Sequence, residues 1–109
     1  MGERTFLGEF ELMVLAAAMR LDEAYGASLI REIEETTDRR VQAGSLYITL
    51  DRLAKKGFLT LRNGKAEPGR GGRPKRYVDV TEEGVTALSA HRQALLSLWD
   101  GLETRLEKS

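Results

Sequence analysis

The sequence of 109 residues contains no cysteine, one histidine and two prolines. Without cysteine there are no disulfide bonds and no thiolate metal ligands, and the composition is compatible with a reducing cytosol. A lone histidine, His91, does not make a histidine-rich metal site. Neither a metal-ligand cluster nor a nucleophile elbow is present in the residues. We therefore expect a protein that is not an enzyme and has no cofactor.

Long apolar runs are also missing. The longest run, LMVLAAAM at 12–19, is too short to span a bilayer, and the N-terminus lacks a basic-then-apolar signal pattern. Apolar residues make up 41% of the chain and charged residues 31%, which is typical of a globular domain with one core. The expected location is the cytoplasm.

Charge of one sign is not in excess overall, but the two signs are separated along the chain. Lys and Arg number 17, as do Asp and Glu, so the formal net charge is zero. The segment 39–76 holds eleven basic and two acidic residues, a net charge of +9, and the rest of the chain carries −9. Such a distribution favours one face that binds a polyanion.

Helical spacing of apolar residues predicts three helices in the first half of the chain. The first covers 6–21 and the second covers 27–37. The third begins with Ser45 at its N-cap or in its first turn and ends at Gly57, a residue that suits the left-handed position after a helix. Its leucines at 46, 50 and 53 are expected to face the core.

Two short alternating segments follow the helices. Residues 58–62 and 76–80 are predicted to form strands around a loop rich in Gly and Pro. Three helices followed by a two-stranded hairpin is the order of the winged helix-turn-helix. The predicted fold is therefore mainly α with a small β-hairpin, and the DNA-binding domain is expected to cover 1–80.

The last segment, 81–109, is predicted to be one long dimerisation helix that Thr81 caps and that runs to about Lys108. At 1.5 Å per residue, about 26 residues would reach about 39 Å. Gly101 inside it predicts either the close approach of a partner or a slight kink. The apolar residues follow a heptad spacing with one polar interruption, typical of a coiled-coil seam between two chains: Val85, Leu88, Arg92, Leu95, Trp99, Leu102 and Leu106.

Four stretches cover nearly the whole chain: LGEFELMVLAAAM at 7–19, AYGASLIREIEETTDRRV at 24–41, GSLYITLDRLAKKGFL at 44–59 and GRGGRPKRYVDVTEEGVTAL at 69–88. In combination, they resemble the PadR family of transcriptional regulators, in its short form with a single C-terminal helix. The resemblance implies a homodimeric DNA-binding winged helix, usually a repressor, whose C-terminal helix dimerises. It further implies that Trp99 can stack a small aromatic effector at the dimer interface, although as a heptad residue it is also an interface anchor.

A helix that enters the major groove needs short polar or apolar side chains for base edges and cations for phosphates. Tyr47 is open to two interpretations, a phosphate contact or a half-buried cap on the core. The partner is expected to be a pseudo-palindromic duplex; the alternative is an acidic protein docked on the same basic face. The candidate DNA-binding residues are Ser45, Tyr47, Ile48, Thr49, Arg52, Lys55, Arg70, Arg73 and Lys75.

Overall fold

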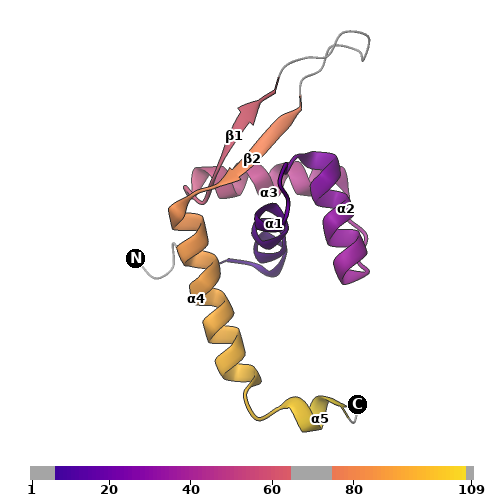
Figure 1. Ribbon diagram of the computed structural model, residues 1–109, viewed down its shortest axis with the longest axis vertical. Coiled ribbons are helices and arrows are strands. Elements are labelled where there is room, and N and C mark those ends of the chain that lie inside the picture. Colours follow the sequence, from indigo (N-terminus) through magenta and orange to yellow (C-terminus); the bar gives the residue numbers. More distant parts are fainter. Residues whose placement is uncertain (1–6, 65–74, 108–109) are drawn as a thin grey trace.

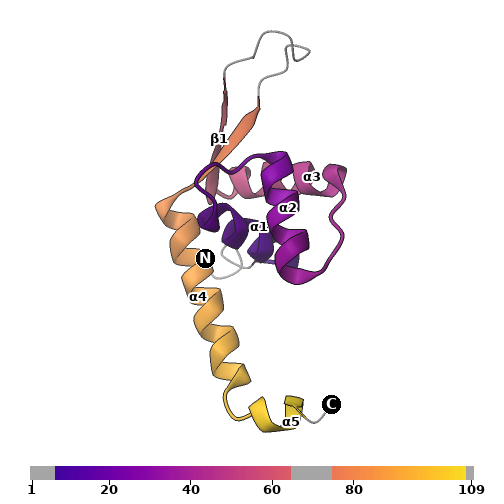
Figure 2. The same cartoon turned by 45° about the vertical axis from the view of Figure 1, so that its right-hand side comes forward.

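The computed structural model describes residues 7–64 and 75–107. Three helices form the body, the hairpin projects from one side, and the fourth helix extends away on the other (Figure 1; Figure 2). This mainly helical architecture with a small hairpin confirms the predicted fold class. The elements in order are α1 (Glu9–Arg20), α2 (Gly26–Thr37), α3 (Ala43–Lys55), β1 (Leu59–Asn63), β2 (Arg76–Val80), α4 (Glu82–Trp99) and α5 (Glu103–Glu107).

The core lies between α1, α2 and α3, with α1 at its centre. Helix α1 contacts α2, α3, β2 and α4, so every large element of the body rests on it. The side chains it buries recur three and four residues apart, which places them on one face of the helix. The most fully buried large side chains are Val14, Leu15, Leu29, Ile33, Leu46, Leu53 and Leu59.

Backbone geometry sets the ends of α2 and α3. Asp38 adopts a left-handed conformation with φ of 61° and ends α2, where its N–H donates to the carbonyl of Glu34. Helix α3 begins at Ala43 with Gln42 as its N-cap, so Ser45 lies in the first turn and is not the cap. Gly57 has φ of 83° and follows the end of α3, as predicted.

The hairpin is antiparallel, with Leu59 opposite Val80 and Leu61 opposite Val78. Its base is joined to the body because the Val78 N–H donates to the carbonyl of Ala24, at 2.8 Å, in the turn before α2. The base therefore has a fixed position beside the start of α2. Strand β1 begins at Leu59, one residue later than predicted, and β2 has the predicted bounds.

Helix α4 is shorter than predicted. Thr81 caps it as expected, its Oγ1 accepting the N–H of Gly84 at 3.0 Å. The helix then ends at Trp99 rather than near Lys108, because Gly101 takes a left-handed φ of 86°. Its 18 residues correspond to about 27 Å. The chain turns through 100–102 into the short α5, which lies across the end of α4 (Figure 2).

This break divides the predicted heptad seam. Leu102 lies in the turn, and Leu106 lies on α5, so neither continues the axis of α4. A Cβ atom at Gly101 would meet nothing within 4 Å, so within the chain the glycine serves a turn and not a close approach. Among residues 7–64 and 75–107, no helix is long and apolar enough to cross a membrane.

Candidate nucleic-acid interface

The outward face of α3 carries most of the sequence-predicted site residues that the structure describes. Leu46, Leu50 and Leu53 are buried, and this fixes the rotation of the helix. As a result Ser45, Tyr47, Ile48, Arg52 and Lys55 are exposed together, and Ile48 is 61% exposed. These side chains are available to a large partner without any change in the core.

Thr49 does not belong to this face. It is only 5% exposed, which corrects the prediction that it points outward with its neighbours. The reason is the helical period: Thr49 follows Leu46 by three residues and precedes Leu53 by four, so it shares their inward side.

Tyr47 packs against the body of the protein and is also partly exposed, and its phosphate contact stays a prediction. Its side chain is about half exposed, and its hydroxyl lies at the start of α2. A Cβ atom at Gly26 would be 2.5 Å from that hydroxyl oxygen, so the ring packs where the glycine leaves space. The ring is therefore held by α2 while one edge remains at the surface.

A hollow of about 680 Å³ separates α3 from the hairpin and the start of α2. The Lys75 ammonium lies 4.3 Å above the ring of Tyr25, which in turn makes an edge contact with Tyr77. Aromatic faces attract cations in this way, and they hold the lysine beside the hollow. The residues that line it are Tyr25, Gly26, Ala27, Tyr47, Asn63, Lys75 and Arg76.

Five of these lining residues were not among the predicted site residues, including Tyr25, Asn63 and Arg76. Asn63 and Arg76 are opposite each other in the hairpin register, and the bridge between Tyr25 and Tyr77 brings Tyr25 beside them. The predicted strands, 58–62 and 76–80, included Arg76 but ended one residue before Asn63, so their bounds did not indicate this pair. The predicted site residues Arg70 and Arg73 lie outside the described residues.

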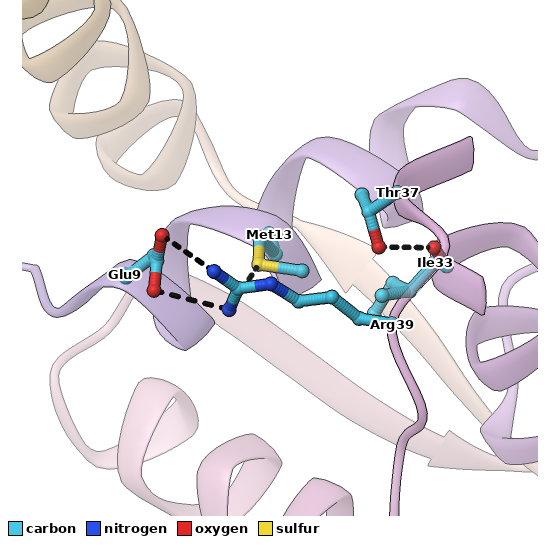
Figure 3. Close-up of polar contacts among 5 residues, drawn as sticks. All are labelled: Glu9, Met13, Ile33, Thr37 and Arg39. Atoms are coloured by element: carbon cyan, nitrogen blue, oxygen red, sulfur yellow. Dashed lines mark hydrogen bonds and ion pairs between the residues drawn. The ribbon is translucent and has the colours of Figure 1, made fainter. Parts of the chain in front are cut away.

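Two cations of the basic segment form ion pairs with carboxylates of α1. Figure 3 shows Arg39 reaching α1, where its two terminal nitrogens each lie 3.1 Å from one carboxylate oxygen of Glu9. Lys56 is held by Glu11, with Nζ 3.0 Å from both carboxylate oxygens. Lys56 thus forms a mostly buried ion pair, although the sequence pattern placed it on the outward face of α3.

The remaining cations divide into paired and unpaired groups. Arg62 contacts Asp79 at 2.8 Å, and Arg76 lies 3.9 Å from Asp51. Within the described part of the chain, Arg52, Lys55 and Lys75 form no ion pair with a carboxylate. Their charge is therefore not neutralised by neighbouring acids, and it lies on α3 and at the loop end of the hairpin.

A second feature lies far from this basic face. Between α1 and α4 there is an apolar groove of about 480 Å³. Trp99, the last residue of α4, is one of the residues that line it. Leu98 on the same helix is 71% exposed. The groove is lined by Leu12, Met13, Ala16, Leu88, Arg92, Leu95, Leu96 and Trp99.

A three-helix body, an attached hairpin and a basic exposed α3 define the winged-helix class of DNA-binding proteins. The sequence model of the transcriptional regulator PadR-like family matches residues 14–90, and the chain belongs to that family. No curated protein is significantly similar to the chain.

Solved structures support the same assignment. A PadR family transcription regulator from Clostridium difficile R20291 is 17% identical, with a TM-score of 0.74, over 91% of this chain and 99% of its own. A PadR family regulator from Eggerthella lenta is 26% identical, with a TM-score of 0.67, over 92% and 85%. The hsRosR-SG complex contains a chain 27% identical, with a TM-score of 0.68, over 96% and 87%.

Proposed function

We propose that this PadR-like regulator is a homodimeric repressor that binds a pseudo-palindromic DNA operator through α3 and the hairpin. The observation that carries the proposal is the exposed face of α3, which has the unpaired cations Arg52 and Lys55, next to the hairpin, whose unpaired Lys75 lines the same hollow as Tyr47 of α3. Unpaired cations on two adjoining elements match the phosphates that border a groove of the duplex.

In this proposal α3 enters the major groove with its N-terminal end toward the bases. Ser45 hydrogen-bonds to a base edge, and the exposed Ile48 meets a thymine methyl group. Arg52 and Lys55, one and two turns further along, bind phosphates, as does the hydroxyl of Tyr47. Arg70 and Arg73, which lie outside the described residues, are proposed to contact the adjacent minor groove.

The dimer is inferred from α4. Most of its large apolar side chains are exposed in the single chain, including Leu95, Leu96 and Trp99. A run of exposed leucines with a tryptophan is an unfavourable surface for an isolated protein and a favourable one for a second copy of the same helix. Two-fold symmetry then places the two α3 helices on half-sites about 34–36 Å apart.

Selection from random duplexes tests the DNA-binding proposal. We expect an inverted repeat, and binding to it that weakens steeply as salt rises, because each phosphate contact releases counterions. Replacing Arg52 and Lys55 with Gln should reduce the slope of log affinity against log salt by about 2 per chain. A wild-type protein that binds no duplex, or binds without salt dependence, would instead favour the acidic-protein alternative.

Repression itself is tested by transcription from a promoter that carries the selected repeat over its start site. The wild-type protein should lower transcript yield in proportion to occupancy of the repeat. The variant that lacks both Arg52 and Lys55 should not lower it at the same concentration. An increase in transcript on binding would contradict the repressor role and leave DNA binding intact.

The groove beside Trp99 supports a small planar aromatic effector. Its apolar lining suits a flat hydrophobic ring, and the chain has one tryptophan, so fluorescence reports on this site alone. Titration with planar aromatic dyes should quench the fluorescence and saturate. A matched Leu98→Ala variant, changed outside the groove lining, should give the same titration. Quenching that rises linearly without saturation would contradict a binding site.

A further inference from the structure

A chain of polar contacts at the start of α1 joins the end of α3 to α4. Lys56, the C-cap of α3, lies 3.0 Å from both carboxylate oxygens of Glu11. The same carboxylate accepts the N–H of Gly8 at 2.9 Å. The preceding residue, Leu7, donates its N–H to Nε2 of His91, on α4, at 3.2 Å. We call these three side chains, Glu11, Lys56 and His91, the polar junction.

The burial of the Glu11 carboxylate explains why the polar junction needs its other members. The Glu11 side chain is 7% exposed, and a carboxylate removed from water requires a charged or hydrogen-bonding partner. Lys56 and the N–H of Gly8 provide both. Leu7 is buried as well, so the N–H that it gives to His91 lies at the edge of the core. Lys56 is therefore paired with Glu11, whereas its neighbour Lys55 forms no ion pair among the described residues.

The polar junction connects α3 to α4 and so bears on the angle between these two helices. Helix α1 contacts both of them, and α4 extends away from the three-helix body on the side opposite the hairpin (Figure 1). In a dimer joined through α4, a small rotation of α3 against α4 changes the distance between the two α3 helices. That distance has to match the spacing of the half-sites on the duplex.

We propose that Glu11, Lys56 and His91 are positioning residues that hold α3 at a fixed angle to α4 and so set the half-site spacing that the protein accepts. The proposal rests on the homodimeric DNA binding proposed above. Lys56 takes part in DNA binding only through Glu11 and the body of the protein, and makes no phosphate contact.

Operators that differ only in spacing test this role. The duplexes carry the selected half-sites at the preferred separation and at one base pair more or less, together with a single half-site. We expect wild-type affinity to fall about tenfold when the spacing changes by one base pair, since protein or DNA has to deform. For Lys56→Met and His91→Phe, the same change of spacing should lower affinity by less than about threefold. Both variants should bind the single half-site with wild-type affinity.

Matched variants separate positioning from other roles. Gln93→Ala, an exposed change on α4 two residues beyond His91, should discriminate between spacings as the wild type does. His91→Gln, which keeps a hydrogen-bond acceptor, should restore the discrimination that His91→Phe removes. If Lys56→Met and His91→Phe discriminate as sharply as the wild type, the positioning role is wrong.

Salt dependence separates Lys56 from its neighbour. Lys55→Met should reduce the slope of log affinity against log salt by about 1, because Lys55 is proposed to bind a phosphate. Lys56→Met should leave the slope unchanged. A slope reduced by about 1 in Lys56→Met would overturn the proposal by making Lys56 a DNA contact.

A folding defect is controlled by removing both charges of the buried pair. Glu11→Gln combined with Lys56→Met leaves no unpaired buried charge, and the glutamine side-chain oxygen can still accept the N–H of Gly8. This double variant should keep the wild-type melting temperature and still lose spacing discrimination. If it discriminates normally, the junction does not position α3. If the wild-type protein binds no duplex at all, it is the proposed function that fails.

Discussion

Helices α3 and α4 both carry leucines at helical spacing, but only α3 buries them within its own chain. Leu46, Leu50 and Leu53 of α3 are almost inaccessible, while Leu95, Leu96 and Leu98 of α4 are 42%, 46% and 71% exposed. The two helices therefore differ in where their apolar faces find partners. The apolar face of α3 packs in the core of its own chain, and we infer that the apolar face of α4 packs against a second copy of the chain.

The difference separates two functions along one chain. A helix whose inner face is fixed by the core presents its outer residues in a defined orientation, which is needed to bind a regular surface such as a duplex. A helix with an open apolar face is suited to association. The predictions below test this contrast, beginning with the largest effect expected.

The first prediction compares one leucine from each helix. Leu53→Ala should lower the free energy of unfolding by about 2–5 kcal/mol, because Leu53 is fully buried and its removal leaves a cavity. Leu98→Ala should leave the unfolding of the monomer almost unchanged. Urea denaturation at low protein concentration measures both. Equal losses for the two variants would contradict the contrast between the helices.

The second prediction concerns association. Leu95→Lys should weaken the dimer about 100-fold or more, since a lysine in an apolar interface loses its hydration. Ser97→Lys, the same change on the opposite face of α4, should leave the dimer intact. Sedimentation over a range of concentrations measures both dissociation constants. Leu106→Lys, on the separate α5, should have a smaller effect than Leu95→Lys.

A third prediction uses two glycines near the proposed DNA surface. Gly26→Ala should lower the free energy of unfolding by about 1–3 kcal/mol, because its Cβ would collide with the Tyr47 hydroxyl. Gly44→Ala should be neutral or stabilising, since a Cβ there meets nothing within 4 Å and alanine favours the helix. Thermal unfolding compares them. A neutral Gly26→Ala would show that the ring of Tyr47 is not held by α2.

The smallest effect concerns pH. A hydrogen bond from Arg20, 2.6 Å from the carboxylate, lowers the pKa of Glu32 below its ordinary value of 4.5, and the Thr36 hydroxyl adds to this. A lowered folded-state pKa contributes stability above the unfolded value, and this contribution is lost as pH falls through the folded value. Arg20→Gln should therefore be slightly destabilising at neutral pH.

The same prediction fixes the direction of the pH dependence. The difference between Arg20→Gln and the wild type should disappear as pH is lowered from about 7 to about 2, where Glu32 is protonated in both states. Arg31→Gln, an exposed change on the same helix, should show no such trend. Urea unfolding at a series of pH values gives the comparison. A difference that grows on acidification would contradict this assignment.

Much of the fold was predictable because its signals are local. The periodicity of α1 and α2, the left-handed glycine at 57 and the cap at Thr81 each depend on a few neighbouring residues, and the structure confirms them. The inner leucines of α3 were predictable for the same reason. Their burial then determines which side chains of α3 face outward, apart from Thr49.

The predictions were wrong where a contact forms between distant segments, or where two local preferences oppose each other. Lys56 has the spacing of a surface lysine, and only the folded chain brings it to Glu11, 45 residues away. The heptad pattern predicted one continuous helix to about Lys108, but the left-handed turn at Gly101 ended it after Trp99. Glycine weakens a helix, and the apolar pattern alone gives no measure of that effect.

The amino-acid sequence by itself determined the first three helices, the hairpin and the separation of basic from acidic segments, because short-range periodicity and turn chemistry depend only on nearby residues. Tertiary structure decided which cations are available to a partner. Arg39 and Lys56 are paired with Glu9 and Glu11, while Arg52 and Lys55 are exposed and form no ion pair among the described residues. The physical reason is that an ion pair depends on distances in space, which only the packing of α1 against α3 defines.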